Sequence, residues 1–339
     1  MRAEWNRFST RRNFDGPLPT VAARWVRVTL QKLSARFKHG YPRTSEFDIV
    51  SRMTRTHLLR ISAGVLFLTG AWIAYTQNQG KAPPELKINK VKDDLYEIEG
   101  DGGNVTAYIT GQGVILVDDK FDRDHEQIVD RVKSVTSEPI KYIISTHHHE
   151  DHSGGNTKFV SSAEIISTVN AHNNIVEHKQ SNATPGMTPA PVTFTDETIV
   201  FLNGKQAIAK AVGRGHTNGD CVVYFPADKV LSTGDLMAGT TPLIDYPGGG
   251  SLKEWPATLD NAMKFDFDTV IPGHGPVTTK MGLMTYRNNV DKEVKRVAGL
   301  VHQKKSEEEI GKVMMAEYGW MPNSLNMQWS LPGFKTEFK

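Results

Sequence analysis

The most constraining feature of the sequence is a histidine cluster that directly follows a short apolar segment. The segment Ile140–Ser145 has the composition of a buried strand, and residues 146–155 read THHHEDHSGG. Alternate side chains of an extended chain share one face, so His147 and His149 can reach the same point in space. The chain is therefore expected to fold around a strand whose end gathers imidazole groups.

Two further candidate ligands follow in the same segment. Asp151 and His152 lie beyond the expected strand end, so their side chains can turn toward a second point. The glycine pair at 154–155 permits a tight exit into a helix, because glycine lacks the Cβ that restricts other residues. His148 and Glu150 alternate with the candidate ligands and are left out of the site.

Three more candidates lie far apart in the sequence, each just after an apolar strand-like segment. Loops at strand ends can gather side chains from distant parts of a chain. Imidazole and carboxylate groups together form a donor set that suits zinc. The pattern therefore predicts a metal centre. The three additional candidates are His216 in a Gly-His pair, Asp235 in a Gly-Asp pair and His274 in a Gly-His-Gly sequence.

The cysteine count excludes two kinds of structure. Cys221 is the single cysteine of the 339 residues, which rules out an intramolecular disulfide and a cysteine-only zinc site. It lies on an expected strand after His216 and is interpreted as a buried core residue. With 38% hydrophobic and 23% charged residues, the chain has the composition of a globular protein.

The remaining pattern alternates strands and helices, which favours sheets packed together with helices outside. A strand pair is expected over Leu86–Glu99 and Asn104–Asp118, joined by a turn at Asp101–Gly103. Further strands are expected over Glu164–Val169, Thr198–Val212 (a hairpin turning at Asn203-Gly204), Cys221–Phe225, Lys229–Ser232 and Thr269–Ile271. Helices are expected over Arg123–Val135, Ala171–Lys179, Ser251–Phe265 (from a capping box at Ser251), Thr278–Val301 and Ser306–Tyr318.

The N-terminal eighty residues have a different character. Residues 1–52 are rich in arginine and are interpreted as a basic extension: a disordered arm, a cytosolic extension, or sequence upstream of a start at Met53. Residues 53–80 contain the apolar run Ile61–Tyr75, which at about 15 residues is short for a membrane span of roughly 20. The basic flank and small residues predict a signal peptide and an exported, periplasmic or extracellular protein; an uncleaved membrane anchor is the alternative.

Charge is distributed unevenly. Residues 1–60 carry 13 Lys and Arg against 4 Asp and Glu, a balance of +9, so the rest of a chain of net charge +2 carries −7. A mildly acidic main domain argues against a nucleic-acid partner. A membrane contact is expected only through the N-terminal apolar run, and only if that run stays uncleaved.

Together, these motifs resemble the metallo-beta-lactamase superfamily. The resemblance rests on HxHxDH at 147–152, then Gly-His, Gly-Asp and Gly-His-Gly, and it covers roughly Leu86 to Thr285. It implies an α+β fold, an αββα sandwich of two mixed sheets with helices on the outer faces. The expected domain spans 85–305, with a C-terminal helix and tail over 306–339.

The resemblance also implies a role for each candidate. A first metal would be held by His147, His149 and His216, and a second by Asp151, His152 and His274. Asp235 would bridge the two ions, a role that only the resemblance supplies. Two Zn²⁺ are expected, with iron as the alternative. A metal-bound hydroxide would then attack the substrate, with Asp151 as the catalytic residue that orients it.

The substrate is not fixed by a fold. The expectation is hydrolysis of a small ester, lactone, thioester or cyclic amide. One alternative is a beta-lactamase of the all-His/Asp subclass, from which the acidic Asp235 is a departure. Another is an iron-dependent oxidoreductase acting on sulfur compounds, and a third is a non-catalytic binding role.

Three side chains are expected near a small-molecule substrate, and a homodimer is one expectation for the helix over Thr278–Val301. Residues 237–250 follow Asp235 and should overhang the metals. The candidate pocket residues are His172, at the start of a helix, and Asp245 and Tyr246, in that loop.

Overall fold

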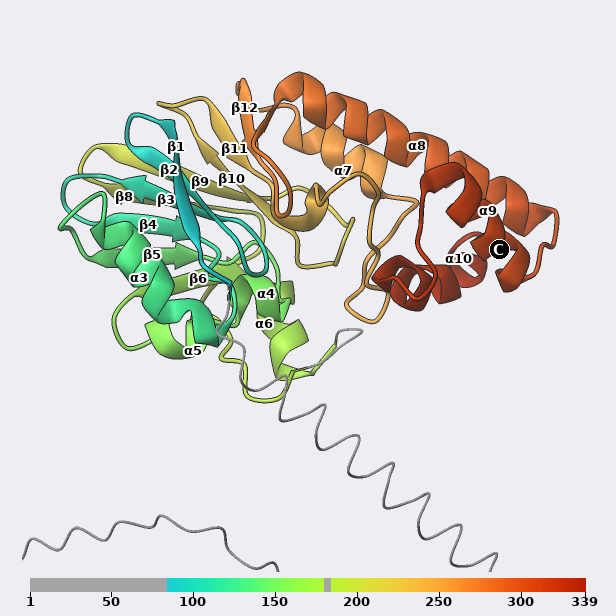
Figure 1. The fold of residues 1–339 in the computed structure, drawn as a ribbon, viewed down its shortest axis with the longest axis horizontal. Helices are drawn as coiled ribbons and strands as arrows, with labels where there is room; N and C mark the ends of the chain where they lie inside the picture. The colour runs from blue at the N-terminus through green and yellow to red at the C-terminus, as the bar shows by residue number, and fades with distance from the viewer. Residues whose placement is uncertain (1–83, 180–183) are drawn as a thin grey trace, which may run out of the picture. The chain divides into compact units, whose positions relative to one another are not determined.

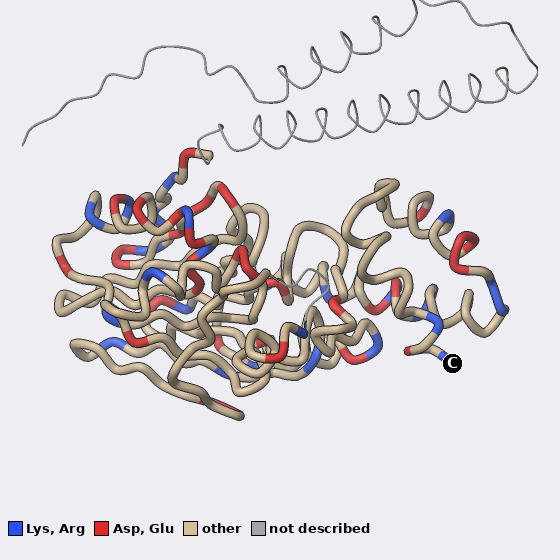
Figure 2. The backbone as a smooth tube through the Cα atoms, turned by 90° about the horizontal axis from the view of Figure 1, so that it is seen from below, with Lys and Arg blue, Asp and Glu red and all other residues tan. Residues whose placement is uncertain are grey.

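The computed structural model describes residues 84–179 and 184–339. The expectations for residues 1–52 and 53–80 therefore lie outside the described residues. Ala82–Lys339 form one compact unit. Within the two described ranges, no helix is both long enough and apolar enough to span a membrane. Lys and Arg residues are interspersed with Asp and Glu along this part of the chain (Figure 2).

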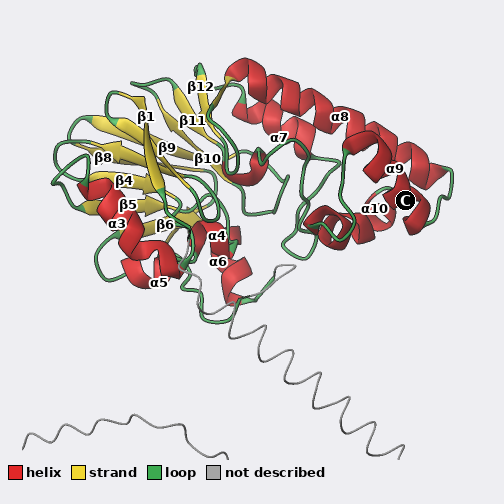
Figure 3. Ribbon diagram, viewed as in Figure 1, coloured by secondary structure: helices red, strands yellow, loops and turns green. Residues whose placement is uncertain are grey.

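Two sheets lie face to face (Figures 1 and 3). The first has seven strands that neighbour one another in sequence order, antiparallel from β1 to β4 and parallel from β4 to β7. The strands of the first sheet are β1 (Lys87–Lys92), β2 (Leu95–Glu99), β3 (Val105–Ile109), β4 (Val114–Val117), β5 (Ile140–Ile144), β6 (Glu164–Thr168) and β7 (Val192–Phe194).

The second sheet has six strands in the order β13-β12-β11-β10-β9-β8. Its one parallel pair is β11 with β12, and the other pairs are antiparallel, so both sheets are mixed. The strands of the second sheet are β8 (Glu197–Leu202), β9 (Lys205–Ala211), β10 (Cys221–Phe225), β11 (Val230–Ser232), β12 (Thr269–Ile271) and β13 (Thr278–Thr279).

Helices cover the outer faces of both sheets (Figure 1). Helices α3 and α5 pack on the first sheet, and α7 and α8 pack on the second. The helices are η1 (Asp122–Asp124), α3 (His125–Lys133), α4 (Glu150–Ser153), α5 (Asn156–Phe159), α6 (Val169–Val176), η2 (Gly234–Leu236), α7 (Trp255–Ala262), α8 (Lys280–His302), α9 (Glu307–Tyr318), the π-helix η3 (Asn326–Ser330) and α10 (Leu331–Glu337).

Three apolar clusters correspond to the three interfaces between these four layers. The alternation of side chains along a strand divides them: in β4, Ile115 and Val117 face the other sheet while Val114 and Leu116 face helices. In β10, Val223 packs between the sheets and Val222 packs under α7 and α8. Both faces of the central strands are thus buried, and the expected αββα sandwich is confirmed.

Several expected elements differ in detail. Each segment of the expected strand pair, Leu86–Glu99 and Asn104–Asp118, folds into a hairpin of its own, turning near Asp93 and Gly111. The prediction that a helix starts at Ser251 was wrong. Ser251 Oγ does accept a hydrogen bond from the Glu254 N–H (3.1 Å), but α7 begins only at Trp255. Strand β7 and helix α10 were not expected.

The hairpin of β8 and β9 is confirmed at its predicted turn. Asn203 and Gly204 both have positive φ, at 50° and 77°. Those angles define the two-residue turn that Asn-Gly favours, because its twist matches that of the flanking strands. Cys221, as expected, is buried between the sheets.

Two phenylalanines, one buried and one exposed, allow a test of how much core packing contributes to stability. Phe225 in β10 is fully buried between the sheets, whereas Phe201 in β8 is 63% exposed. We expect Phe225→Ala to lower the free energy of unfolding by about 3–5 kcal/mol, because it leaves a cavity in a packed core. Phe201→Ala should change it by less than about 0.5 kcal/mol. Urea denaturation of both variants measures the difference; equal losses would contradict this packing.

A buried carboxyl on α8 should make stability depend on pH. Glu293 is 1% exposed and its Oε1 has no hydrogen-bond partner among the described residues. Burial raises the pKa of Glu293 from 4.5 to about 8. Between those two values the folded chain keeps a proton that the unfolded chain has released, so stability should fall as pH rises through this range.

We therefore expect Glu293 to lower the free energy of unfolding by up to about 4 kcal/mol between pH 5 and pH 9. Glu293→Gln cannot ionise and should show a flatter pH dependence, with a gain over wild type at pH 9 and little change at pH 5. Denaturation curves at the two pH values test this. Parallel pH profiles for both proteins would refute it.

Candidate metal centre

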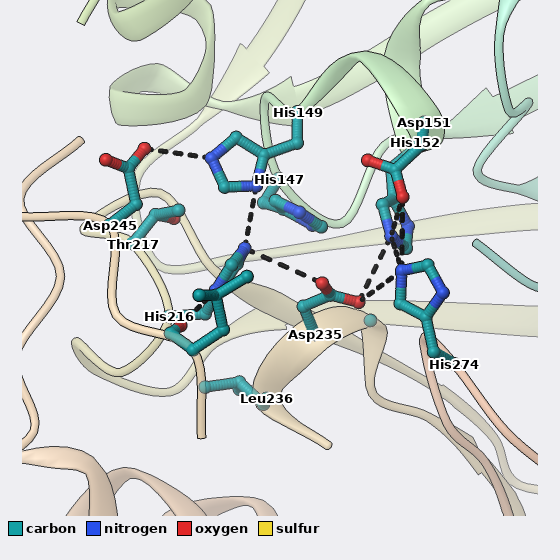
Figure 4. Close-up of polar contacts among 12 residues, drawn as sticks. His147, His149, Asp151, His152, His216, Thr217, Asp235, Leu236, Asp245 and His274 are labelled. Atoms are coloured by element: carbon teal, nitrogen blue, oxygen red, sulfur yellow. Dashed lines mark hydrogen bonds and ion pairs between the residues drawn. The ribbon is translucent and has the colours of Figure 1, made fainter. Parts of the chain in front are cut away.

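Each predicted ligand follows the end of a strand, as the sequence indicated. The histidine cluster follows β5 and runs into α4, and His216 follows β9. Asp235 lies in η2, directly after β11, and His274 follows β12. The two sheets bring these ends to one edge of the sandwich, and Figure 4 shows all seven side chains gathered there.

Three imidazoles form a first group. His147, His149 and His216 each offer a ring nitrogen, and these nitrogens lie within 4.8 Å of one another. His149 Nδ1 is 2.7 Å from His216 Nε2. His147 Nε2 is buried and has no hydrogen-bond partner within the described residues. A buried nitrogen without a partner carries a desolvation penalty, which a bound cation would remove.

A second group combines imidazole and carboxylate. His152 Nε2 lies 3.2 Å from His274 Nε2 and 3.7 Å from Asp151 Oδ2. His274 Nε2 is 3.1 Å from Asp151 Oδ2. The side chains of His274 and Asp151 are 38% and 28% exposed, whereas His152 is fully buried. The second group is therefore the open side of the site.

Asp235 lies between the two groups. Its Oδ1 is 3.1 Å from His152 Nε2 and 3.5 Å from His274 Nε2. Its Oδ2 is 3.6 Å from His216 Nε2 (Figure 4). One carboxylate thus directs one oxygen toward each group, which is the arrangement that a bridging ligand requires.

The imidazoles are oriented by hydrogen bonds on their opposite nitrogens. A carbonyl or carboxylate partner only accepts, so each such nitrogen carries the hydrogen and the other keeps its lone pair for a metal. The three contacts are His216 Nδ1 to the Leu243 carbonyl at 2.5 Å, His149 Nε2 to Asp245 Oδ2 at 2.8 Å and His152 Nδ1 to Asp118 Oδ2 at 2.8 Å.

Asp118 serves both groups and was missed by the sequence reasoning. Besides His152, its carboxylate accepts from the N–H of Thr146 (2.7 Å) and from its hydroxyl (2.8 Å). Because that hydroxyl donates to Asp118, its oxygen is left to accept from His147 Nδ1 at 3.0 Å. The available signal was the position of Asp118 directly after β4, at the same sheet edge as the histidines.

Two imidazoles of the first group, His147 and His216, favour the neutral form. Burial, together with the neighbouring imidazoles, holds the pKa of His147 well below its usual value. For the same reasons, with His149 the main neighbour, the pKa of His216 falls to about 4. Neutral imidazole is the form that binds a metal, so these nitrogens are ready to do so at neutral pH.

The second group balances its charges internally. Burial opposes ionisation of Asp151, but His152 and His274 outweigh it and hold the pKa of Asp151 at about 2. Burial also opposes the charged form of His152, yet Asp235, Asp151 and Asp118 raise its pKa well above the usual value. Without a metal, protons on imidazole compensate the carboxylates, and a divalent cation can take over that role.

The donor set fits two metal ions. In each group two imidazole nitrogens lie at hydrogen-bond distance, 2.7 Å between His149 and His216 and 3.2 Å between His152 and His274. Two nitrogen lone pairs repel each other at such a distance unless a proton or a cation lies between them. Imidazole nitrogens with carboxylate oxygens are ligands of zinc, and of iron in other sites. The residues present could therefore hold a metal ion in each group, and Asp235 directs one oxygen toward each.

The three expected pocket residues lie outside both groups. Asp245 is fully buried, and its carboxylate accepts from His149. Tyr246 donates to Glu337 at 2.6 Å, which ties the loop to α10. His172, in α6, has its Nδ1 2.8 Å from the Ala190 carbonyl. His148, left out of the site, is buried with Nε2 2.9 Å from the Lys179 carbonyl.

The loop that carries His216 is fixed by a buried acid that the sequence reasoning also missed. Asp220 accepts from the Thr217 N–H at 3.0 Å and from its hydroxyl at 2.5 Å. Burial outweighs these hydrogen bonds and raises the pKa of Asp220 to about 7. The turn between His216 and β10 is therefore held from inside the protein.

Fold and site together define an αββα sandwich with candidate metal ligands at one edge, and the comparison with known families identifies it as a metal-dependent hydrolase. The family model of the metallo-beta-lactamase superfamily matches residues 98–274. The chain belongs to this superfamily. The matched range includes all seven candidate ligands and ends at His274, so α8 to α10 lie beyond it.

Individual relatives give the same family at modest identity. A metallo-beta-lactamase type 2 of Elizabethkingia meningoseptica is 27% identical over 58% of this chain and 81% of its own length. The 2,4-dinitroanisole O-demethylase subunit alpha of a Nocardioides species is 27% identical over 56% of this chain and 58% of its own. The crystal structure of the DIM-1 metallo-beta-lactamase superposes with a TM-score of 0.54 at 25% identity, covering 62% of this chain and 99% of that one.

Asp118 offers a test of how the site is held. In Asp118→Asn, one carboxylate oxygen becomes an NH2 group that only donates. It would face either the Thr146 N–H or the donors of His152 and the Thr146 hydroxyl, so the site should lose orientation. We expect metal affinity to fall by about 10- to 100-fold, as for other partners of metal-binding histidines. Competition with a chromogenic chelator measures it. Asp122→Asn, an exposed position in η1, is the control; unchanged affinity in Asp118→Asn would contradict this role.

Proposed function

We propose that the protein is a dinuclear zinc hydrolase that cleaves a small ester, lactone, thioester or cyclic amide, with beta-lactams among the candidates. The observation that carries the proposal is Asp235, whose two oxygens point to two adjacent ligand groups. The first group would be His147, His149 and His216, and the second Asp151, His152 and His274.

Two divalent ions held by these residues would lower the pKa of a bound water and polarise a carbonyl group of the substrate. The chain's own residues supply the rest. Asp151 is partly exposed on the open side, and its pKa of about 2 keeps Oδ2 ionised at neutral pH. It can therefore accept a hydrogen bond from an attacking water and orient it, while His274 beside it fixes the carboxylate.

Zinc is proposed over iron on the donor set. The seven candidate ligands are five imidazoles and two carboxylates, and hydrogen bonds from residues outside the set orient four of the imidazoles. No redox partner residue is needed for hydrolysis. An iron-dependent oxidoreductase remains the competing proposal, and metal analysis of the purified protein distinguishes the two.

Two observations bear on the substrate class, the named relatives and the acidic residue Asp235. The relatives named beta-lactamases favour a cyclic amide. The acidic residue at Asp235 favours lactones and thioesters, since the all-His/Asp beta-lactamases that the site resembles lack it. The demethylase relative adds 2,4-dinitroanisole as a test compound. We also propose that the protein is exported, on the basis of the apolar run in residues 53–80.

Turnover by zinc-loaded protein tests the proposal. A chromogenic cephalosporin, a thioester, a lactone and 2,4-dinitroanisole form the panel, each measured with and without a chelator. Chelator-sensitive hydrolysis of the cephalosporin, the thioester or the lactone supports the proposal, whereas hydrolysis of 2,4-dinitroanisole alone would support a metal-dependent hydrolase with a different substrate class. Loss of two zinc ions without loss of turnover, or oxygen consumption by an iron-loaded enzyme, would refute it.

Asp151→Ala separates catalysis from folding. We expect the rate constant to fall by about 10²- to 10⁴-fold, because the carboxylate that orients the water is gone. The unfolding transition should stay close to that of wild type, since Asp151 is partly exposed. Asp93→Ala, whose side chain is 99% exposed, is the control and should keep its rate. A loss of only a few-fold in Asp151→Ala would show that another group orients the water.

A further inference from the structure

An aromatic residue from the C-terminal segment reaches the metal centre. Trp329 lies in η3, far beyond the residues that match the family model. Its ring packs against the imidazole of His149 with centroids 5.5 Å apart and planes at 64°. Trp329 is only partly buried, so part of the residue is exposed to solvent while its ring contacts His149.

The position of η3 is fixed by the loop that follows Asp235. Ser330 Oγ accepts from the Ile244 N–H at 2.8 Å, and Asn326 Nδ2 donates to the Pro242 carbonyl at 2.7 Å. These two bonds flank Trp329 in sequence, so its backbone is held on both sides. The aromatic side chain is therefore preorganised and does not depend on a flexible tail.

The same loop orients two of the metal ligands. The Leu243 carbonyl accepts from His216, and Asp245 accepts from His149. Ile244, between them, is the residue that Ser330 binds. Three consecutive residues thus join the C-terminal segment to the first ligand group, and Trp329 has a defined place relative to both histidines.

The resulting site has two unlike sides. The second group itself presents two partly exposed polar side chains, Asp151 and His274. Beside the first group lies Trp329, a broad aromatic surface. Ligand sites combine apolar walls with a few polar groups that fix orientation, and tryptophan gives a large contact area at small entropic cost.

We propose that Trp329 forms the specificity wall of this site and accepts a flat, unsaturated or aromatic group of the substrate next to the first ligand group. The inference rests on the proposed function and narrows its substrate class. Aromatic contacts of this kind correspond to a preference of about 2- to 10-fold over a small aliphatic group.

A purely structural role is the competing explanation, in which Trp329 only supports His149. The two roles differ in what the variant changes. A support for His149 affects every ligand of the metals alike, whereas a wall affects only ligands that carry an aromatic group. The measurement must therefore compare two ligands on the same protein.

Thiols provide this comparison without any turnover, because a thiolate binds zinc directly. We would titrate the full-length zinc-loaded protein with phenylmethanethiol, 2-phenylethanethiol and ethanethiol in a calorimeter, and determine the zinc content of each variant. The variants are Trp329→Ala, Trp329→Phe and Leu325→Ala. Leu325 adjoins the same π-helix and is 49% exposed, which makes it a matched control.

We expect Trp329→Ala to lower the ratio of aromatic to aliphatic thiol affinity by about 3- to 10-fold, Trp329→Phe to retain most of it and Leu325→Ala to leave it unchanged. If Trp329→Ala loses affinity equally for all three thiols, or keeps the ratio of aromatic to aliphatic thiol affinity, Trp329 does not determine specificity. The proposed metal centre is not affected by that result. Failure of wild type to hold zinc or bind any thiol would overturn the proposed function and this inference together.

Discussion

The hydrogen bonds that the Asp118 carboxylate accepts are the interaction on which the site depends. One oxygen holds His152 of the second group, and the bonds to Thr146 pass orientation on to His147 of the first. Asp118 is buried at the end of β4, and β5, which carries the histidines, is its parallel neighbour. The pairing of two strands therefore sets the alignment of two imidazoles, one in each ligand group.

A second constraint comes from the loop that follows η2. Residues 242–245 are bonded to His149 and His216 on one side and to η3 on the other. Helix α10 adds Glu337, which accepts from Tyr246 and from Ser251. The C-terminal segment, which lies beyond the family match, is thus joined to the metal site by hydrogen bonds and contributes to its shape.

Elements that depend on residues close together in the sequence were predicted correctly. Strand β5, the Asn203-Gly204 hairpin and helix α9 follow from periodicity, turn chemistry and capping. The helix start at Ser251 was predicted wrongly because its hydroxyl serves a turn and also donates to Glu337, a partner far along the chain. The candidate ligands could be named because their residue types and strand-end positions are both visible in the sequence.

The sequence by itself was enough to predict the αββα class, through the family resemblance that its motifs carry, and to name seven candidate metal ligands. The HxHxDH spacing and the place of the other three candidates just after apolar segments are both local properties. Only the tertiary structure decided which groups orient them and what borders them. Asp118, Asp245 and Trp329 lie 34, 96 and 180 residues from the histidines they contact. Contacts at such separations arise from how sheets and helices pack, and no local spacing encodes them.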